Sequence, residues 1–140
     1  MPKNLLKKII NDEDLHAAGF NFAAIWLIGK SANVVSSTLF HFDLNRYNSI
    51  DHLAIGVGIG TLAYKKAGGG LRGVLTGLVA GTLFNAGWEA LEYKSHIWNT
   101  KESMIDTITD VAFVYVGNIL SFLGEKAKEY VNRKDKNSQR

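Results

Sequence analysis

The stretch that decides the fold is residues 71–93, LRGVLTGLVAGTLFNAGWEALEY. It carries no charge between Arg72 and Glu89. Glycine recurs every four residues, at Gly73, Gly77 and Gly81. In a water-soluble helix each of these glycines costs about 1 kcal/mol relative to alanine. In a membrane, a row of small residues on one helical face lets a neighbouring helix approach closely. The stretch therefore predicts a helix that crosses a lipid bilayer.

Three other apolar stretches lie before and after this one, and together they predict an all-α, four-helix transmembrane bundle. We expect spans at about 17–42, 50–64, 71–93 and 103–123. The second is short, because a spanning helix needs about 20 residues. Asp51 and His52 therefore have to enter the membrane region to complete it. Lys30 interrupts the first span, where it is expected to snorkel towards the interface or to pair inside the bundle.

Polar segments flank the predicted spans. Leu5, Leu6, Ile9 and Ile10 alternate with lysines at helical spacing, which predicts a short amphipathic helix at the membrane interface. An ordinary surface helix is the alternative. Residues 1–125 are expected to form a single transmembrane domain, followed by a basic cytoplasmic tail at 126–140. The mean hydropathy of the whole chain is near zero, which is low for a multi-pass protein, and these hydrophilic ends explain part of that value.

The charge distribution predicts how the bundle is oriented. The chain has 140 residues and a formal net charge of +3. With four spans both termini lie on one side, together with the turn at 65–72, and these segments hold most of the lysine and arginine. The opposite loops hold only Arg46, Lys94 and Lys101. Because cytoplasmic loops are enriched in basic residues, we expect an inner-membrane protein with both termini in the cytoplasm.

Several classes of function are not supported by the sequence. There is no cysteine, so disulfides and cysteine metal sites are excluded. The basic residues lie between apolar stretches rather than beside aromatic residues on one face, so no nucleic-acid partner is expected. No Gly-x-Ser-x-Gly, P-loop or HExxH motif is present. The glycines at Gly56, Gly58 and Gly60 lack the strand–helix context of a nucleotide loop, and close helix packing explains them better.

The predicted topology gathers acidic residues and histidines at the extracytoplasmic face. They are His41, Asp43, Asp51, His52, Glu89, Glu92, His96, Asp106 and Asp110. Residues three or four apart share a helical face, so two carboxylate pairs on neighbouring helices could meet across the bundle. We take six of these residues as the candidate catalytic site: Asp51, His52, Glu89, Glu92, Asp106 and Asp110.

Structural roles compete with this hypothesis. Asp51 and Asp106 lie in first helical turns, where a carboxylate suits the helix dipole. Glu89 and Glu92 are less easily explained, because they lie near a helix C-terminus and near the hydrocarbon boundary. A lysine, a protonated histidine or a metal ion should compensate them, and an interfacial salt-bridge network is the simplest alternative. His41 and His96 are weaker candidates, because a lone histidine at the interface more often has a structural role.

A divalent metal ion is the cofactor that this set of side chains would suit. Oxygen ligands with a histidine fit Zn, Mg, Mn or Fe. The residues that would hold it are Glu89, Glu92, Asp106, Asp110 and His52. Their spacing matches no zinc signature, so the identity of the metal is left open.

The order of these motifs resembles a known family. Asp51-His52 opens a glycine-rich apolar helix, residues 88–92 read Trp-Glu-Ala-Leu-Glu, and residues 106–110 read Asp-Thr-Ile-Thr-Asp. This order, over residues 49–120, resembles the VanZ-like and YjdF-like groups of small bacterial membrane proteins. VanZ-like proteins usually have Gln after the glutamate and an Arg before the last helix, whereas Glu92 and Lys101 stand there in this chain. The YjdF-like pattern fits better, and the resemblance implies a polytopic membrane protein.

Three functions are compatible with the sequence. The first is a metal-assisted activity on a lipid or envelope precursor, with a lipid-type ligand. The second is a proton- or ion-handling transport module, which requires polar residues running through the bundle. The third is a non-catalytic subunit or scaffold that joins a homo-oligomer or a larger membrane complex through the Gly73, Gly77 and Gly81 face. A soluble four-helix bundle is the alternative to the membrane interpretation.

Overall fold

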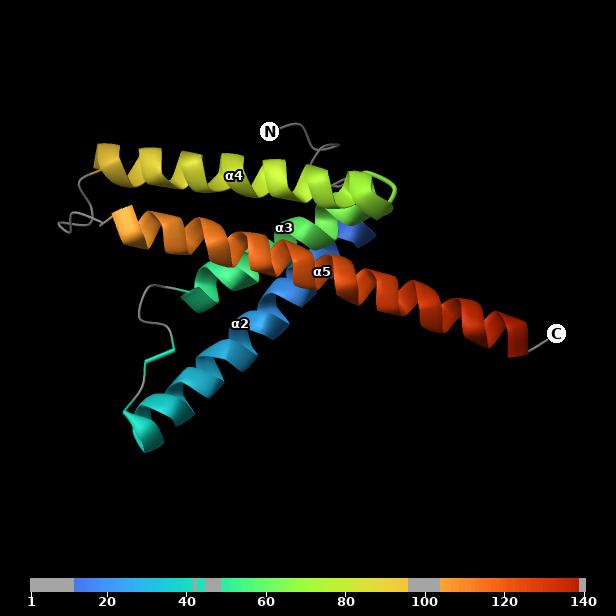
Figure 1. Ribbon diagram of the computed structural model, residues 1–140, viewed down its shortest axis with the longest axis horizontal. Helices are drawn as coiled ribbons and strands as arrows, with labels where there is room; N and C mark the ends of the chain where they lie inside the picture. Colours follow the sequence, from blue (N-terminus) through green and yellow to red (C-terminus); the bar gives the residue numbers. More distant parts are fainter. Residues whose placement is uncertain (1–11, 42, 45–48, 96–103, 139–140) are drawn as a thin grey trace.

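The computed structural model is built from four α-helices (Figure 1). It describes residues 12–41, 43–44, 49–95 and 104–138, without the side chains of 92–95, 104–106 and 137–138. The helices are α2 (Glu13–Phe40), α3 (Ser49–Lys66), α4 (Gly70–Ser95) and α5 (Met104–Ser138). The described part contains no strand, so the all-helical prediction is confirmed there. The predicted amphipathic helix near the N-terminus lies outside the described residues.

The helix boundaries follow from local chemistry. Asp12 caps α2, because its carboxylate accepts the backbone N–H groups of Asp14 and Leu15, both at 3.1 Å. The helix ends at His41, which takes the left-handed conformation with φ 53° while its N–H donates to the carbonyl of Ser36. Three successive residues with positive φ, Gly68–Gly70, make the turn into α4. Only glycine adopts that run of conformations without strain.

α3 is the centre of the bundle, since it packs against α2, α4 and α5 and makes its largest contact with α5. The side-chain contacts show the directions of the helices. Lys30 near the end of α2 meets Asp51 at the start of α3, whereas Asp12 meets Lys66 at the other end, so these two helices are antiparallel. His52 meets Asp110 in the first part of α5, so α3 and α5 run parallel. In Figure 1, α2 diverges from α4 and α5 towards its C-terminal end.

Glycines on α4 let it approach α3 and α5 closely. A Cβ added at Gly73 would lie 2.8 Å from the Cα of Tyr64, and one at Gly81 would lie 2.8 Å from a methyl group of Val114. Gly77 packs against the side chain of Asn118. The glycine row of α4 therefore packs against the chain's own α3 and α5. The expected assembly with other copies or a larger complex stays a prediction.

The distribution of side chains differs from that in a typical water-soluble bundle. Among the described residues, seven polar side chains are buried, as many as the buried apolar ones. The buried polar residues are Ser49, His52, Thr61, Asn85, Asp110, Asn118 and Ser121. Large apolar side chains cover the outside instead, for example Phe20 at 74% and Leu71 at 72% exposure. Buried polar groups and extended apolar surface are the two observations that require an explanation in any fold.

Length and composition identify one candidate membrane span among the described helices, within Thr107–Lys136 of α5. Only 28% of its most apolar window is buried inside the chain. α3 has 18 residues, which include Asp51, Lys65 and Lys66. Glycine, threonine, serine and asparagine lower the average hydropathy of α2 and α4. A bundle of four spans is therefore not confirmed by this criterion.

α5 is longer than predicted. The basic segment from residue 126, expected to be a tail, is helical as far as Ser138. In Figure 1 this C-terminal part of α5 extends beyond the other helices. Ion pairs at helical spacing support it, from Lys126 to Glu129 at 3.0 Å and from Lys128 to Glu125 at 2.8 Å.

Candidate functional site

A buried histidine–aspartate pair joins α3 to α5. Nε2 of His52 lies 3.2 Å from Oδ2 of Asp110, and each side chain is 10% exposed. Both residues come from the parts of α3 and α5 that lie away from the end of the bundle where Lys65 and Lys66 bind Asp12 and Asp14, termed the inner end. The pair is charged when His52 is protonated, and removing two charges from solvent is costly unless they compensate each other. Asp110 is thus the compensating group for a histidine inside the bundle.

Glycines one turn beyond His52 on α3 and two turns beyond Asp110 on α5 explain why the pair forms. A Cβ added at Gly56 would lie 2.8 Å from the Cα of Val114, and one at Gly117 would lie 2.8 Å from the backbone nitrogen of Val57. At both points the backbones of α3 and α5 touch. His52 precedes Gly56 by four residues, and Asp110 precedes Val114 by four. Because the two helices are parallel, this close approach brings the side chains together one turn away.

Asp51, the residue before His52, points to the other side of α3. Its Oδ2 accepts a hydrogen bond from Lys30 Nζ at 2.7 Å, and its Oδ1 accepts one from the indole Nε1 of Trp26 at 2.7 Å. The ammonium also lies 5.9 Å from the centre of the Trp26 ring. The side chains of Lys30 and Asp51 are 31% and 33% exposed. The consecutive residues Asp51 and His52 therefore bind α3 to α2 and to α5, respectively.

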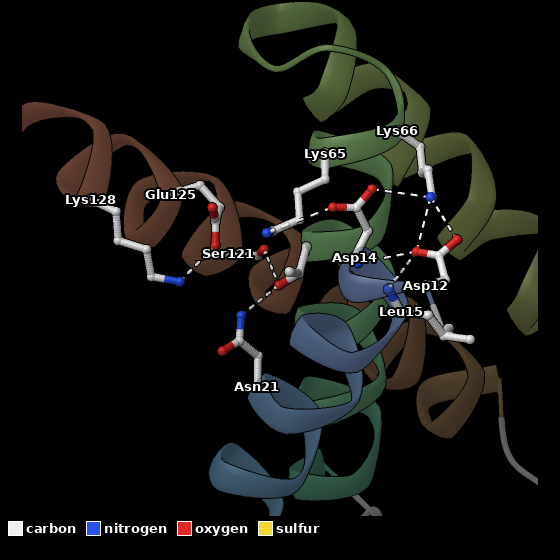
Figure 2. Close-up of polar contacts among 10 residues, drawn as sticks. Asp12, Asp14, Leu15, Asn21, Lys65, Lys66, Ser121, Glu125 and Lys128 are labelled. Carbon is white, nitrogen blue, oxygen red and sulfur yellow. Dashed lines mark hydrogen bonds and ion pairs between the residues drawn. The ribbon is translucent and has the colours of Figure 1, made fainter. Parts of the chain in front are cut away.

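A second polar layer lies further along the bundle. The Asn21 amide donates to Oγ1 of Thr61 at 3.0 Å, and this hydroxyl shares a hydrogen bond of 2.8 Å with Ser121. The helices α2, α3 and α5 are thus linked at Thr61, and Figure 2 shows Asn21 and Ser121 pointing towards the same place. Thr61 is completely buried. The layer lies about 14 Å from His52, since nine residues of helix separate Thr61 from it.

Asn118 is wedged between glycines of the two neighbouring helices. Its Nδ2 donates to the carbonyl of Val114 at 3.1 Å. Its Oδ1 accepts no hydrogen bond in the described part of the chain and packs against Gly60 and Gly77. Asn85 is buried as well and continues the four-residue spacing of the α4 glycine row. These asparagines extend the polar character of the interior, Asn118 beside the Thr61 layer and Asn85 further along α4.

Ion pairs close the inner end of the bundle (Figure 2). Lys66 binds Asp12 at 2.7 Å and Asp14 at 3.1 Å, and Lys65 lies 3.8 Å from Asp14. The hydrogen bond from Lys66 lowers the pKa of the Asp12 carboxyl, and the backbone N–H of Leu15 adds to this effect. The same carboxylates raise the pKa of Lys66, Asp12 more than Asp14. Both groups therefore stay ionised at neutral pH.

Tyr64 links the inner end of α3 to α5. Its hydroxyl donates to Oε1 of Glu129 at 2.6 Å, while Lys126 binds Oε2 of the same carboxylate at 3.0 Å. The bond from Tyr64, and then that from Lys126, lowers the pKa of Glu129. The Lys126 ammonium also lies 5.7 Å from the centre of the Tyr64 ring. These contacts fix the register of α5 against α3 at the end opposite His52.

The structure brings together part of the site predicted from sequence. His52 and Asp110 form a pair, whereas Asp51 binds Lys30 on α2 instead. Glu89 is half-buried on α4, one turn beyond Asn85. The side chains of Glu92 and Asp106 lie outside the described residues. Among the side chains that are described, no three His, Asp or Glu residues come together as metal ligands. The predicted divalent metal site, which needs Glu92 and Asp106, stays a prediction.

Sequence reasoning missed the roles of Thr61, Ser121 and Tyr64. Thr61 and Ser121 are hydroxyl residues among apolar ones, and Tyr64 ends an apolar run, so these positions are the signal that could have singled them out. Their contacts depend on the parallel register of α3 and α5. The two helices are separated along the chain by α4, and no local pattern fixes how they align.

Comparisons with known proteins give no relative for this chain. No protein-family model, no curated protein sequence and no solved structure matches it. The resemblance of its motifs to the VanZ-like and YjdF-like proteins stays a prediction.

Proposed function

We propose that the chain is an integral membrane protein of four spans with both termini in the cytoplasm. The support is the distribution of side chains, with polar residues in the interior and large apolar residues outside. In water such a surface would associate or aggregate. In a bilayer the same surface faces lipid, and the interior polar groups bond with one another. The buried glycine contacts agree, because helices in membranes associate through small residues.

The proposed placement puts the His52–Asp110 pair beneath the outer boundary of the hydrocarbon region. The basic residues Lys65, Lys66 and Arg72 mark the inner boundary, near the start of α4 at Gly70. A core about 30 Å thick corresponds to about 20 helical residues, which places the outer boundary near residue 90. Asn85, one turn beyond the Gly81 contact with Val114, then lies about 7 Å inside that boundary. The His52–Asp110 pair lies at about the same level.

The function that this arrangement supports best is proton handling. An ionisable group within a membrane is costly, so it is retained chiefly where it serves an ion or proton pathway. Histidine is the side chain whose charge changes most readily near neutral pH. With Asp110 as its partner, His52 can accept a proton as part of an ion pair or release it as a neutral pair. The pair is the single observation that carries the proposal.

The inner polar layer provides a second group of polar side chains along the proposed proton pathway. Asn21, Thr61 and Ser121 form a hydrogen-bonded group about 14 Å below His52. Between the two levels, the backbone contacts at Gly56 and Gly117 exclude water. A proton therefore crosses only when α3 and α5 move apart, and the charge state of the His52–Asp110 pair, which joins them, would control that movement.

Proton handling is favoured over the metal-assisted reaction on a lipid that the sequence also allows. A transport module requires polar residues along the bundle, and the two layers supply them at two levels. The metal-assisted reaction on a lipid depends on Glu92 and Asp106. A scaffold role would not explain why the ionisable His52–Asp110 pair is buried.

Proton movement in reconstituted vesicles tests the proposal. Liposomes that contain the protein and an internal pH-sensitive dye should lose an imposed pH gradient faster than empty liposomes. His52→Gln and Asp110→Asn should each return the rate to that of empty liposomes. His16→Gln and Asp135→Asn are matched controls, because these exposed residues carry the same chemical changes outside the site.

Two outcomes would contradict proton handling. One is a wild-type protein that inserts in the membrane with full helix content yet moves no protons. The other is a rate that survives both substitutions at the pair. Elemental analysis of the same preparations tests the alternative metal hypothesis. A stoichiometric metal ion that Asp110→Asn removes would favour a metal site over proton handling.

A further inference from the structure

We infer that Asn85 of α4 binds a buried water molecule that links the His52–Asp110 pair to the outer face of the bundle, opposite the inner end. Asn85 is then a positioning residue, which acts on the pair through the bound water. The inference rests on the proposed proton handling, because it supplies the route by which the pair exchanges protons with the outer side.

The amide of Asn85 is a hydrogen-bond donor without a partner inside the bundle. Asn85 is 4% exposed, and its Nδ2 donates no hydrogen bond to any residue that the structure describes. A buried donor left unsatisfied is costly, and lipid offers it no alternative partner. Buried water molecules satisfy such groups in proteins, each with about three polar neighbours. The unpartnered Nδ2 therefore points to a bound ligand at this position.

The contacts of the α4 glycines place Asn85 beside the buried pair. Gly81 packs against Val114, and Gly77, one turn earlier, packs against a residue one turn later in α5, so the two helices are antiparallel. Asn85 follows Gly81 by four residues and lies on the same face of α4. Continuing the register by this one turn brings it to the level of Asp110, the aspartate of the pair.

The surrounding chemistry selects water over an ion. Because Nδ2 is a donor, its ligand must offer an acceptor, which a metal cation does not. An anion is disfavoured by the carboxylate of Asp110 at the same level. A water molecule is neutral, accepts from Nδ2, and has two protons left for backbone carbonyls, each of which has two lone pairs. Water, unlike an amide, can also take up and pass on a proton.

The polar face of α4 continues from Asn85 towards the outer side. Glu89 follows Asn85 by four residues, on the same helical face, and is half-buried. Four residues of helix span about 6 Å, so Glu89 lies close to the outer hydrocarbon boundary of the proposed placement. The water at Asn85 thus lies between the buried pair and a carboxylate at the boundary, and it divides the outer part of the pathway into two short steps.

Nuclear Overhauser effects between water and side-chain amides test the site in the full chain, reconstituted in nanodiscs. The amide protons of Asn85, assigned from their loss in Asn85→Leu, should show a cross-peak to water. A rotating-frame experiment separates this effect from proton exchange, because the two have opposite signs. Asn118 is the matched control in the same spectrum, since it is 3% exposed and its Nδ2 already donates to the carbonyl of Val114. No cross-peak at Asn85, as at Asn118, would overturn the inference.

Proton movement in reconstituted vesicles tests the role of the bound water. Asn85→Leu removes the donor and should lower the initial rate about tenfold, the factor that corresponds to one hydrogen bond. Asn85→Ser keeps a hydroxyl group and leaves room for water, so it should retain most of the wild-type rate. Asn132→Leu, the same change at an exposed position of α5, should have no effect.

Circular dichroism verifies that each variant keeps its helix content. An unchanged rate in a folded Asn85→Leu variant would overturn the role of the water. Equal loss in Asn85→Leu and Asn85→Ser would overturn it as well, because the amide itself would then be required.

The two proposals fail separately in this design. A water cross-peak at Asn85 in a protein that moves no protons would overturn proton handling and leave the water site. Proton movement that His52→Gln abolishes, in a protein without the cross-peak, would overturn the water site and leave proton handling.

Discussion

Breaking the His52–Asp110 pair should cost far more stability than breaking the Lys30–Asp51 pair. At 3.2 Å, two unit charges attract each other by about 5 kcal/mol for an effective dielectric constant near 20. Desolvation offsets much of this attraction while both partners are present. Removing one partner leaves the other buried and uncompensated, which costs about 3–5 kcal/mol. The Lys30–Asp51 pair is about a third exposed, and such pairs contribute about 0.2–1 kcal/mol.

A pair of double-mutant cycles measures the difference. One cycle uses His52→Gln and Asp110→Asn, and the other uses Lys30→Met and Asp51→Asn. The free energy of unfolding is obtained in mixed micelles by titration with a denaturing detergent, followed by circular dichroism. The buried cycle should show a coupling energy of about 2 kcal/mol or more, within the range for contacting residues. The exposed cycle should show less than about 1 kcal/mol.

Equal coupling in the two cycles would refute the reasoning, because burial would then not decide the strength of the pairs. A buried cycle in which each single variant is as stable as the wild type would refute it more strongly. That result would mean that His52 is uncharged and that Asp110 is compensated by another group.

Three further predictions follow from the packing and the pKa shifts. Gly56→Ala should destabilise the bundle by about 1–3 kcal/mol, because the added Cβ would collide with the backbone of α5. Gly124→Ala, with open space around it, should stabilise α5 slightly, and thermal unfolding in detergent compares the two variants. Thr61→Val should cost about 1–3 kcal/mol in the same assay, because it leaves buried polar partners unsatisfied, and an unchanged midpoint would contradict that role. The lowered pKa of Asp12 means that its pair with Lys66 stabilises the fold above about pH 4, the ordinary pKa of aspartate. This contribution is lost as the pH falls through the lower pKa of the folded state. Asp12→Asn should therefore reduce the loss of stability at acid pH.

The helices were predictable because their ends carry local signals. The predicted span at 50–64 became Ser49–Lys66, and that at 71–93 became Gly70–Ser95. In each case charges or glycines mark where the apolar pattern stops. The predicted span ended at residue 123, and the segment 126–138, which is too polar for a span, continues the same helix. Hydropathy does not distinguish a polar helix from a polar tail.

The candidate site was predictable only in part, because hydropathy does not fix the rotation of a helix. Successive residues of an α-helix point about 100° apart, so Asp51 and His52 cannot face the same neighbour. The sequence predicted that Asp51 and His52 belong to one cluster, whereas in the structure Asp51 binds α2 and His52 binds α5. The pairing with Asp110 depends on contacts at Gly56 and Gly117, which lie in separate parts of the chain.

The central position of α3 has a consequence for biosynthesis. In the proposed membrane placement, the ribosome delivers α2 and α3 first, as a hairpin, while the main neighbour of α3 is still untranslated. Until α5 emerges, the imidazole of His52 and the hydroxyl of Thr61 have no α5 partner within the lipid. A nascent or truncated chain that ends before Asp110 therefore lacks both the carboxylate that pairs with His52 and the hydroxyl of Ser121 that bonds with Thr61.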